Sequence, residues 1–131
     1  NQFLNRQKDH DLPLIIANVT SGAAERPIYG WSAYCSTKAS LNMYTKTVAL
    51  EQEELGTENK IIAFSPGVMD TEMQTEIRSS TKEQFADIEK FKGYKLSNSL
   101  RDTDIVAGVL IDIITDEDVK NGKIYYITNY L

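Results

Sequence analysis

Two short apolar runs on either side of one long helical pattern limit the possible folds of this chain more than any other feature. Residues 12–19 read LPLIIANV and residues 60–65 read KIIAFS. Nearly continuous apolar runs of this length are typical of strands buried on both faces, as in parallel sheets. Residues 32–55 have helical periodicity, which ends at Gly56. Because adjacent parallel strands need a crossover between them, this pattern predicts a β-α-β unit.

The remaining segments continue the alternation of helices and strands. Ser, Gly and Pro residues predict a loop over 20–31, and the Asn-Gly pair at 121–122 predicts a turn into a last strand over 123–128. Asp102 or Thr103 can cap a further helix. We expect parallel strands with right-handed crossovers in one α/β domain. The other expected features are the end of a helix over 1–9, short helices over 71–79 and 82–92, and an apolar face of Ile105, Val106, Val109, Leu110 and Ile113 on the helix after residue 102.

Composition and charge exclude several functions. Nineteen acidic against fourteen basic residues give a net charge of -5, which is a poor match for nucleic acid. No apolar run approaches the ~20 residues that span a bilayer, so we expect no membrane partner and a cytoplasmic protein. The single cysteine, Cys35, permits no internal disulfide, and we expect it to be a small packed residue rather than a nucleophile. No metal site is expected, because Asp70 and Glu72 have no histidine nearby and suit a helix N-terminus.

Tyr34 and Lys38 could form a reactive pair. They are four residues apart on the expected helix, so both project to one side. A free tyrosine has a pKa of about 10, and a neighbouring ammonium favours the phenolate. Tyr34 could then act as a general acid, and Ser21 at the end of the first strand could hold a substrate carbonyl. Spacing alone also fits two solvated residues of an exposed helix, and Ser21 also fits a simple turn.

Three motifs in order closely resemble the C-terminal half of the short-chain dehydrogenase/reductase family: NVTSGAA at 18–24, YCSTKASL at 34–41 and SPGVMDTEM at 65–73. The segments at 30–44 and 66–74 look most like its sepiapterin reductase and benzil reductase branch. The resemblance implies that residues 1–131 are the C-terminal catalytic part of one Rossmann-like domain, a doubly wound parallel sheet with three strands and flanking helices here. The family's N-terminal dinucleotide-binding half, with its glycine-rich fingerprint, is absent from this sequence.

The resemblance also implies roles for particular residues. Tyr34 would donate a proton to the carbonyl oxygen as hydride arrives from the nicotinamide, Lys38 would favour the phenolate and bind the ribose hydroxyls, and Ser21 would hold the carbonyl. Residues 69–95 would cover the substrate. Trp31 could line the substrate pocket or pack under the loop. The expected catalytic residues are thus Ser21, Tyr34 and Lys38, the cofactor-binding residues are Tyr34, Lys38, Pro66, Gly67, Val68 and Thr71, and the substrate-binding residues are Ser21, Trp31 and Tyr34.

The implied activity is NADPH-dependent reduction of a small carbonyl compound, a diketone or an aromatic ketone, and no residue here rules out NADH. Sepiapterin reductases place a pterin-binding aspartate near the start of the last strand, where this chain has Tyr126. The resemblance also implies a homodimer through the long helix, whose stripe of Leu41, Tyr44 and Val48 could form the contact. The alternative is a catalytically inactive fragment that acts only as a self-associating structural module. We expect no reductase activity from the isolated 131-residue chain.

Overall fold

The computed structural model describes residues 12–67 and 102–131. In these ranges, three parallel strands form one sheet in the order β1-β2-β3, with β1 at Ile15–Val19, β2 at Lys60–Ser65 and β3 at Ile124–Tyr126. The expected α/β fold with a parallel sheet is therefore confirmed. Outside the described residues lie the predictions for the helix end at 1–9, the short helices at 71–79 and 82–92, the substrate cover at 69–95, and the residues Val68, Asp70, Thr71 and Glu72.

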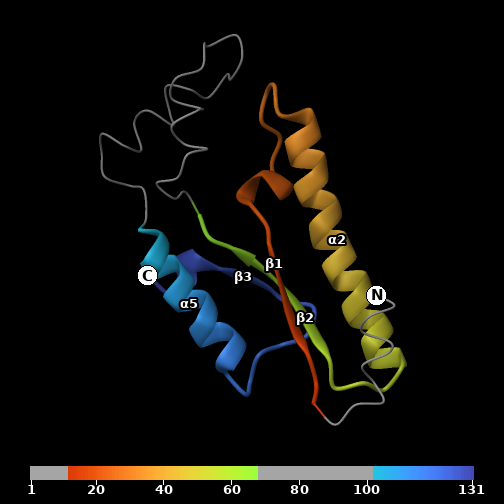
Figure 1. Cartoon of the computed structure of the whole chain (residues 1–131). Coiled ribbons are helices and arrows are strands. Elements are labelled where there is room, and N and C mark those ends of the chain that lie inside the picture. Colours follow the sequence, from red (N-terminus) through yellow and green to blue (C-terminus); the bar gives the residue numbers. More distant parts are fainter. Residues whose placement is uncertain (1–11, 68–101) are drawn as a thin grey trace.

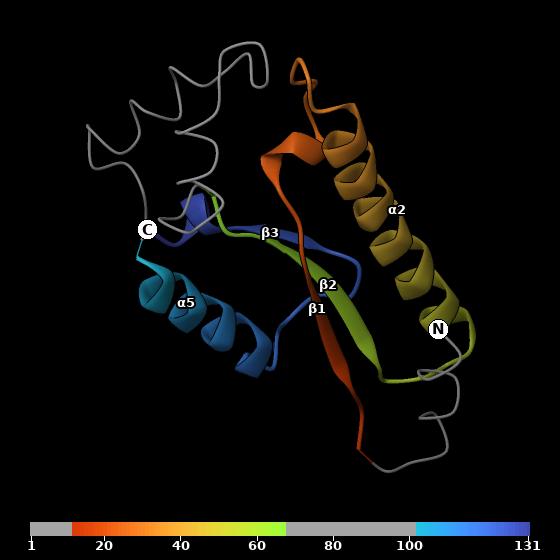
Figure 2. The same cartoon turned by 45° about the horizontal axis from the view of Figure 1, so that its top comes forward.

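Two helices cover opposite faces of the sheet (Figures 1 and 2). α2, Ser32–Glu54, packs Val48 against Ile61 of β2, whereas α5, Thr103–Thr115, packs against Ile62 of the same strand. Because side chains alternate along a strand, consecutive residues of β2 enter different cores. Both isoleucines are at most 1% exposed, which confirms the expected burial of this strand on both faces.

The ends of the helices follow from local backbone chemistry. Gly56, with a φ of 70°, follows α2, and its N–H and that of Thr57 donate to carbonyls in the last turn of the helix. Glycine reaches this left-handed conformation without strain, so it suits a helix end of this kind. At α5, the Asp102 carboxylate accepts a hydrogen bond from the N–H of Asp104 (2.8 Å), so Asp102 rather than Thr103 is the cap. No helix in the described ranges is both long enough and apolar enough to cross a membrane.

Three predictions about these elements are wrong in detail. β1 begins at Ile15 rather than at residue 12, because its ladder with β2 begins there. β3 ends at Tyr126, because the chain turns there into the 3-10 helix η2, Ile127–Asn129. Ile105 is 56% exposed whereas Val106 is 4% exposed, because neighbouring residues point about 100° apart around a helix. The apolar face of α5 is therefore narrower than expected.

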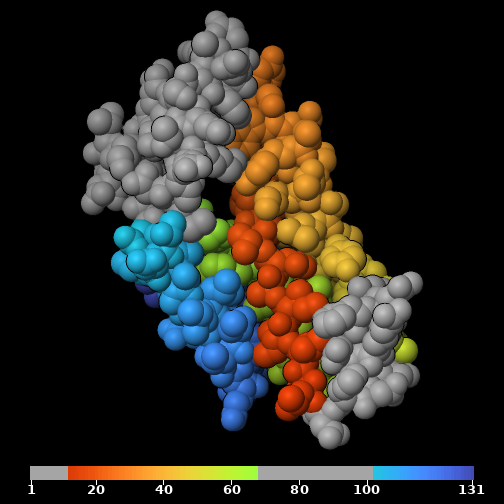
Figure 3. Space-filling model, viewed as in Figure 1, coloured from red at the N-terminus to blue at the C-terminus, as the bar shows by residue number. Residues whose placement is uncertain are grey.

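β1 lies at the edge of the sheet and pairs only with β2 within residues 12–67 and 102–131. Figure 3 shows it running along the surface between α5 and α2. Ile15 and Val19 are 42% and 47% exposed, whereas Ile16 and Ala17 are partly buried against the two cores, so the expected burial on both faces holds only in part for this strand. An edge strand leaves backbone groups that a further strand could pair with.

The Asn-Gly turn before β3 also fastens α2 to the sheet. The Asn121 side chain donates to the carbonyl of Ala49 in α2 and accepts from the N–H of Ile61 in β2, both at 2.9 Å. Gly122 has a φ of 79°, and a Cβ at this position would lie 3.0 Å from the Cβ of Ala49. The turn therefore needs both an amide side chain and a residue without a side chain.

Replacing Gly122 with alanine should destabilise the protein, since it adds left-handed strain and a close contact with Ala49. We expect a loss of more than about 1 kcal/mol in the free energy of unfolding, measured by urea denaturation. Gly108 in α5 is the matched control, because a new Cβ there meets open space and Gly108→Ala should stabilise the protein by up to about 1 kcal/mol. Wild-type stability of the Gly122→Ala variant would contradict this account.

Candidate active site

The residues that follow β1 and β2 meet at one edge of the sheet. The N–H of Thr20 donates to the carbonyl of Phe64 (2.8 Å), which holds the end of β1 beside the end of β2. Ser21 follows Thr20 directly, and Pro66 and Gly67 follow β2 at the same edge. Gly67 has a φ of 73°, a conformation that favours glycine. Ligands of open parallel sheets bind beyond this edge, so these residues border a candidate site.

Ser21 is the N-cap of a short 3-10 helix, η1, at Gly22–Ala24. Its Oγ accepts a hydrogen bond from the N–H of Ala23 (3.2 Å), and its carbonyl accepts one from the N–H of Ala24 (3.0 Å). A hydroxyl has two lone pairs and one proton. This arrangement therefore holds the Ser21 oxygen in place and keeps its proton available to an acceptor such as a carbonyl group.

Tyr34, in the first turn of α2, is held against η1 by an apolar cluster. The buried side chains of Ala23, Ile28 and Trp31 form this cluster, and the Tyr34 ring packs against them. Among the described residues, none shares a hydrogen bond with the Tyr34 hydroxyl. The packing therefore places the phenol beside η1, whose N-cap is Ser21.

Lys38 lies one turn after Tyr34 and reaches the same edge of the sheet. Its Nζ donates to the carbonyl of Val19, the last residue of β1, at 3.1 Å, and lies 5.8 Å from the centroid of the Tyr34 ring. An ammonium has three N–H donors, so two remain for other groups. The three expected site residues therefore lie near the end of β1, since Val19 is two residues before Ser21 and Tyr34 packs on η1.

Trp31 packs beneath the loop before α2, which is one of the two roles considered for it. It is 6% exposed, and its ring meets the Tyr34 ring edge to face, with centroids 5.2 Å apart. Its direct contact with a substrate stays a prediction. Cys35 is partly buried against the same cluster, and its Sγ lies 3.8 Å from the carbonyl of Arg26, as expected for a packed residue.

The face that α2 turns toward the sheet includes Val48, a residue of the stripe expected to form a dimer contact. Val48 is 2% exposed in the core whereas Tyr44 is 48% exposed, so Val48 cannot belong to the expected dimer contact. The side chains buried beside Val48 include the polar residues Asn42, Thr45 and Gln52. Each of them accepts a hydrogen bond from a side chain outside the helix, which is how a polar group tolerates burial.

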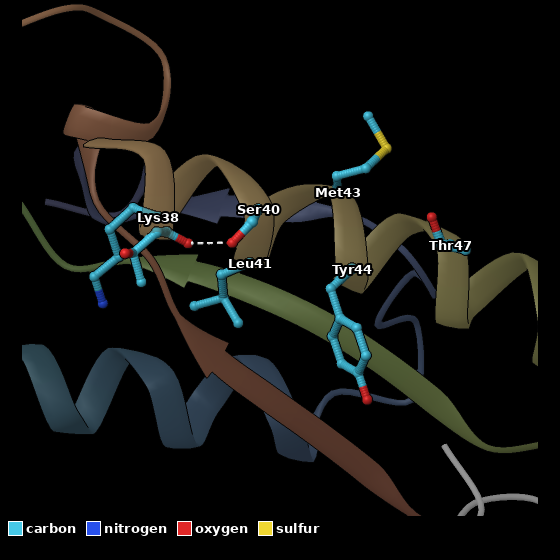
Figure 4. A pocket seen from close by; sticks show the side chains of 7 residues that line it. Lys38, Ser40, Leu41, Met43, Tyr44 and Thr47 are labelled. Carbon is cyan, nitrogen blue, oxygen red and sulfur yellow. Dashed lines mark hydrogen bonds between the residues drawn. The ribbon is translucent and has the colours of Figure 1, made fainter. Parts of the chain in front are cut away.

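The exposed side of α2 carries an open groove of about 840 Å³. Lys38, Leu41 and Tyr44 project to one side of the helix there, whereas Met43 and Thr47 project to the other (Figure 4). Leu41 and Tyr44 of the expected stripe therefore line an exposed surface, whereas Val48 is buried in the core.

A contact between Tyr126 and Glu25 joins the last strand to η1, and nothing in the sequence pattern indicates it. Tyr126 ends β3, Glu25 follows η1 as its C-cap, and the Tyr126 hydroxyl donates to the Glu25 carboxylate. This hydrogen bond, partial burial and the negative charge of Glu25 raise the pKa of Tyr126 above its usual value of 10.0. The third strand therefore also reaches the edge that carries Ser21.

Comparisons with known proteins agree with the resemblance seen in the motifs. A family model described as short chain dehydrogenase matches residues 14–82. The benzil reductase ((S)-benzoin forming) of Bacillus subtilis is 49% identical over 98% of this chain and 53% of that protein. The sepiapterin reductase of Xenopus tropicalis is 27% identical over 86% of this chain and 41% of that protein. The crystal structure of the KRED1-Pglu enzyme has a TM-score of 0.73 at 27% identity, over 84% of this chain and 46% of that one.

The chain spans about half the length of the curated relatives it matches. The segment matched by the family model contains β1, η1, α2 and β2. It therefore includes every described residue that the motifs assigned to the site, from Ser21 to Gly67. The chain belongs to the short-chain dehydrogenase family.

Proposed function

We propose that the full-length protein reduces a small carbonyl compound to an alcohol. The observation that carries this proposal is that Tyr34 packs on η1, whose N-cap is Ser21, while Lys38 donates a hydrogen bond to Val19 at the end of β1. A hydrogen-bond donor, a proton donor and a cation are the groups that carbonyl reduction needs. The similarity to a benzil reductase over 98% of the chain supports the same class of reaction.

Each group has a distinct role in this proposal. The Ser21 hydroxyl donates a hydrogen bond to the carbonyl oxygen, since the N–H of Ala23 already occupies an acceptor site on its oxygen. The Tyr34 hydroxyl transfers its proton to the carbonyl oxygen as the carbon is reduced. The Lys38 ammonium, 5.8 Å from the ring centroid, stabilises the phenolate that remains. Trp31 restricts the movement of the phenol ring by packing against it.

A nicotinamide dinucleotide bound at this edge would supply the hydride. The residues present fit such a group, because Lys38 keeps N–H donors for ribose hydroxyls and exposed Gly67 lets a flat ring approach the backbone. We assign Pro66, Gly67, Val68 and Thr71 to this cofactor together with Tyr34 and Lys38, the assignments of Val68 and Thr71 resting on the motif alone. NADPH is the proposed reductant, and the ratio of kcat/KM for NADPH and NADH measures the preference.

For the substrate we propose a diketone or an aromatic ketone, with benzil as the first compound to test. Tyr126 stands where the sepiapterin reductase pattern has a pterin-binding aspartate, and its hydroxyl is engaged with Glu25. A neutral phenol in an internal contact is a poor substitute for a carboxylate that binds a pterin. The 49% identity to a benzil reductase supports the same choice.

We also propose a setting for this activity. Residues 1–131 form the C-terminal catalytic part of a single domain, in which residues 69–95 cover the substrate. The protein acts on a small molecule as a cytoplasmic homodimer. The similarity in fold to a crystal structure of which the chain covers 46% supports the larger domain.

Replacing Tyr34 with phenylalanine in the full-length protein should lower kcat for benzil at least ~100-fold, the scale of a lost general acid, while cofactor binding is retained. Steady-state consumption of NADPH and a cofactor titration measure the two quantities. Tyr44→Phe is the matched control, because it removes a hydroxyl from an exposed position on the same helix and should leave kcat unchanged. Near-normal turnover by Tyr34→Phe would refute the role, and no turnover by wild type would favour the inactive fragment.

The contact between Tyr126 and Glu25 should make stability depend on alkaline pH. Since folding raises the pKa of Tyr126, the contact contributes stability that is fully present below about pH 10 and is lost as the pH rises through the raised value. Wild type should exceed Tyr126→Phe in urea midpoint at about pH 8, and the difference should shrink above about pH 10. Tyr29→Phe, at a position that is 81% exposed, should show no difference at either pH. A difference that stays constant across this range would contradict the contact.

A further inference from the structure

The surface between α2 and the end of β1 is built from buried polar side chains. Thr20 is 3% exposed, Asn42 is 8% exposed and Thr45 is fully buried at 0%. Apolar side chains could fill such a surface without any need for partners, whereas a buried polar group is costly unless it is hydrogen-bonded. The polar residues at this surface therefore have a role besides filling the space between α2 and β1.

Three consecutive residues at the end of β1 bond to one face of α2. The helix residues that take part are Lys38, Asn42 and Thr45, which are spaced as neighbours on a single face. The Thr45 hydroxyl also donates to the carbonyl of Leu41 (2.9 Å). The contacts are Asn18 Nδ2 donating to Thr45 Oγ1 (3.1 Å), Lys38 Nζ donating to the carbonyl of Val19 (3.1 Å), and Thr20 Oγ1 donating to Asn42 Oδ1.

This set of contacts fixes α2 relative to Ser21. Thr20 directly precedes Ser21, and it is held on one side by the carbonyl of Phe64 and on the other by Asn42. Asn42 lies one turn after Lys38, on the same face. Hydrophobic contact has no direction and would let the helix slide or rotate, whereas hydrogen bonds weaken steeply when they are misaligned. The polar contacts therefore define one position of the helix.

We infer that Thr20 and Asn42 are positioning residues, whose hydrogen bond sets the Ser21 hydroxyl relative to Tyr34 and Lys38. This inference rests on the proposed function, which assigns the reaction to Ser21, Tyr34 and Lys38. Neither Thr20 nor Asn42 touches the carbonyl in that proposal. They act through the residues next to them in the strand and along the helix. A displacement of about 1 Å between reacting groups can cost ~100-fold in rate, so a small shift of α2 would be felt in catalysis.

A second buried polar cluster on α2 offers a matched control. Gln52 Oε1 accepts from Thr57 Oγ1 (2.8 Å) and from Asn59 Nδ2 (3.2 Å), and Asn59 Oδ1 accepts from the N–H of Leu14 (2.9 Å). Gln52 is 0% and Asn59 is 4% exposed. This cluster lies where α2 ends, at the opposite end of the helix from Tyr34. Its loss should lower stability without moving the candidate site.

The decisive variant replaces both partners in the full-length protein, as Thr20→Val with Asn42→Leu. Replacing both members of a buried hydrogen bond by apolar groups of similar shape is nearly neutral for stability. We expect a melting temperature close to wild type but a kcat lowered about 10- to 100-fold, with the KM for cofactor little changed. Thr20→Ser keeps the hydroxyl and should keep kcat, whereas Asn59→Leu should lower the melting temperature and leave kcat unchanged.

Amide hydrogen exchange gives a readout that does not depend on the reaction. The N–H groups of Ala23 and Ala24 are held by Ser21, so a mobile Ser21 should expose them. We expect the exchange rate of these amides to rise about 10-fold or more in the double variant, because local opening then requires less free energy by the contribution of about one hydrogen bond. The exchange rate should stay unchanged in Asn59→Leu.

Wild-type kcat and wild-type exchange in a stable double variant would overturn the inference. If the double variant fails to fold, Thr20→Val alone decides: a kcat no lower than that of Asn59→Leu would also overturn it. If wild type reduces no carbonyl compound, the proposed function fails, and faster exchange at Ala23 and Ala24 still supports the positioning role while unchanged exchange rejects it.

Discussion

The docking of α2 against the carboxyl end of β1 is the constraint on which the chemistry of this chain depends. Ser21 is carried by the strand end, whereas Tyr34 and Lys38 are carried by the helix, so no single element brings them together. The hydrogen bond from Lys38 to Val19 and the packing of Tyr34 on η1 close this gap. A change in the angle or height of the helix would therefore separate the hydroxyl donors even if each side chain were intact.

The same docking explains why α2 has an unusual composition for a helix that packs on a sheet. Its far end is held by apolar contacts of Val48 and Ala49 with Ile61, and the Asn121 side chain bridges this helix and β2. Closer to its start, Lys38, Asn42 and Thr45 form hydrogen bonds with the end of β1 and the residue after it, and Tyr34 packs on η1. Apolar burial supplies most of the stability of such an interface, and hydrogen bonds choose one geometry among those that apolar contact would accept. The division suits a helix that must be both stable and accurately placed.

Much of the fold could be predicted from local patterns. The buried strand at 60–65, the long helix that ends before Gly56 and the cap at Asp102 each depend on neighbouring residues, and the structure has all of them. The motifs also pointed to Ser21, Tyr34 and Lys38, which lie near the end of β1. The resemblance to a known family was needed there, because the docking of α2 on β1 and η1 sets the environment of these residues rather than the local pattern.

The remaining features depend on partners that are distant in the sequence. Asn42 and Thr45 look like surface residues until β1 and the residue after it supply Asn18 and Thr20, so the apolar pattern of α2 does not show which face packs on the sheet. Glu25 and Tyr126 are 101 residues apart, and no periodicity connects them. Tertiary contacts of this kind override local pattern.

A crystal structure of the full-length protein with benzil and the oxidised cofactor tests the central claim most directly. The account predicts one carbonyl oxygen of benzil within hydrogen-bond distance, about 2.6–3.2 Å, of both the Ser21 and the Tyr34 hydroxyl oxygens. A benzil molecule bound with its carbonyl oxygens away from both hydroxyls, while the cofactor occupies the carboxyl edge of the sheet, would contradict it.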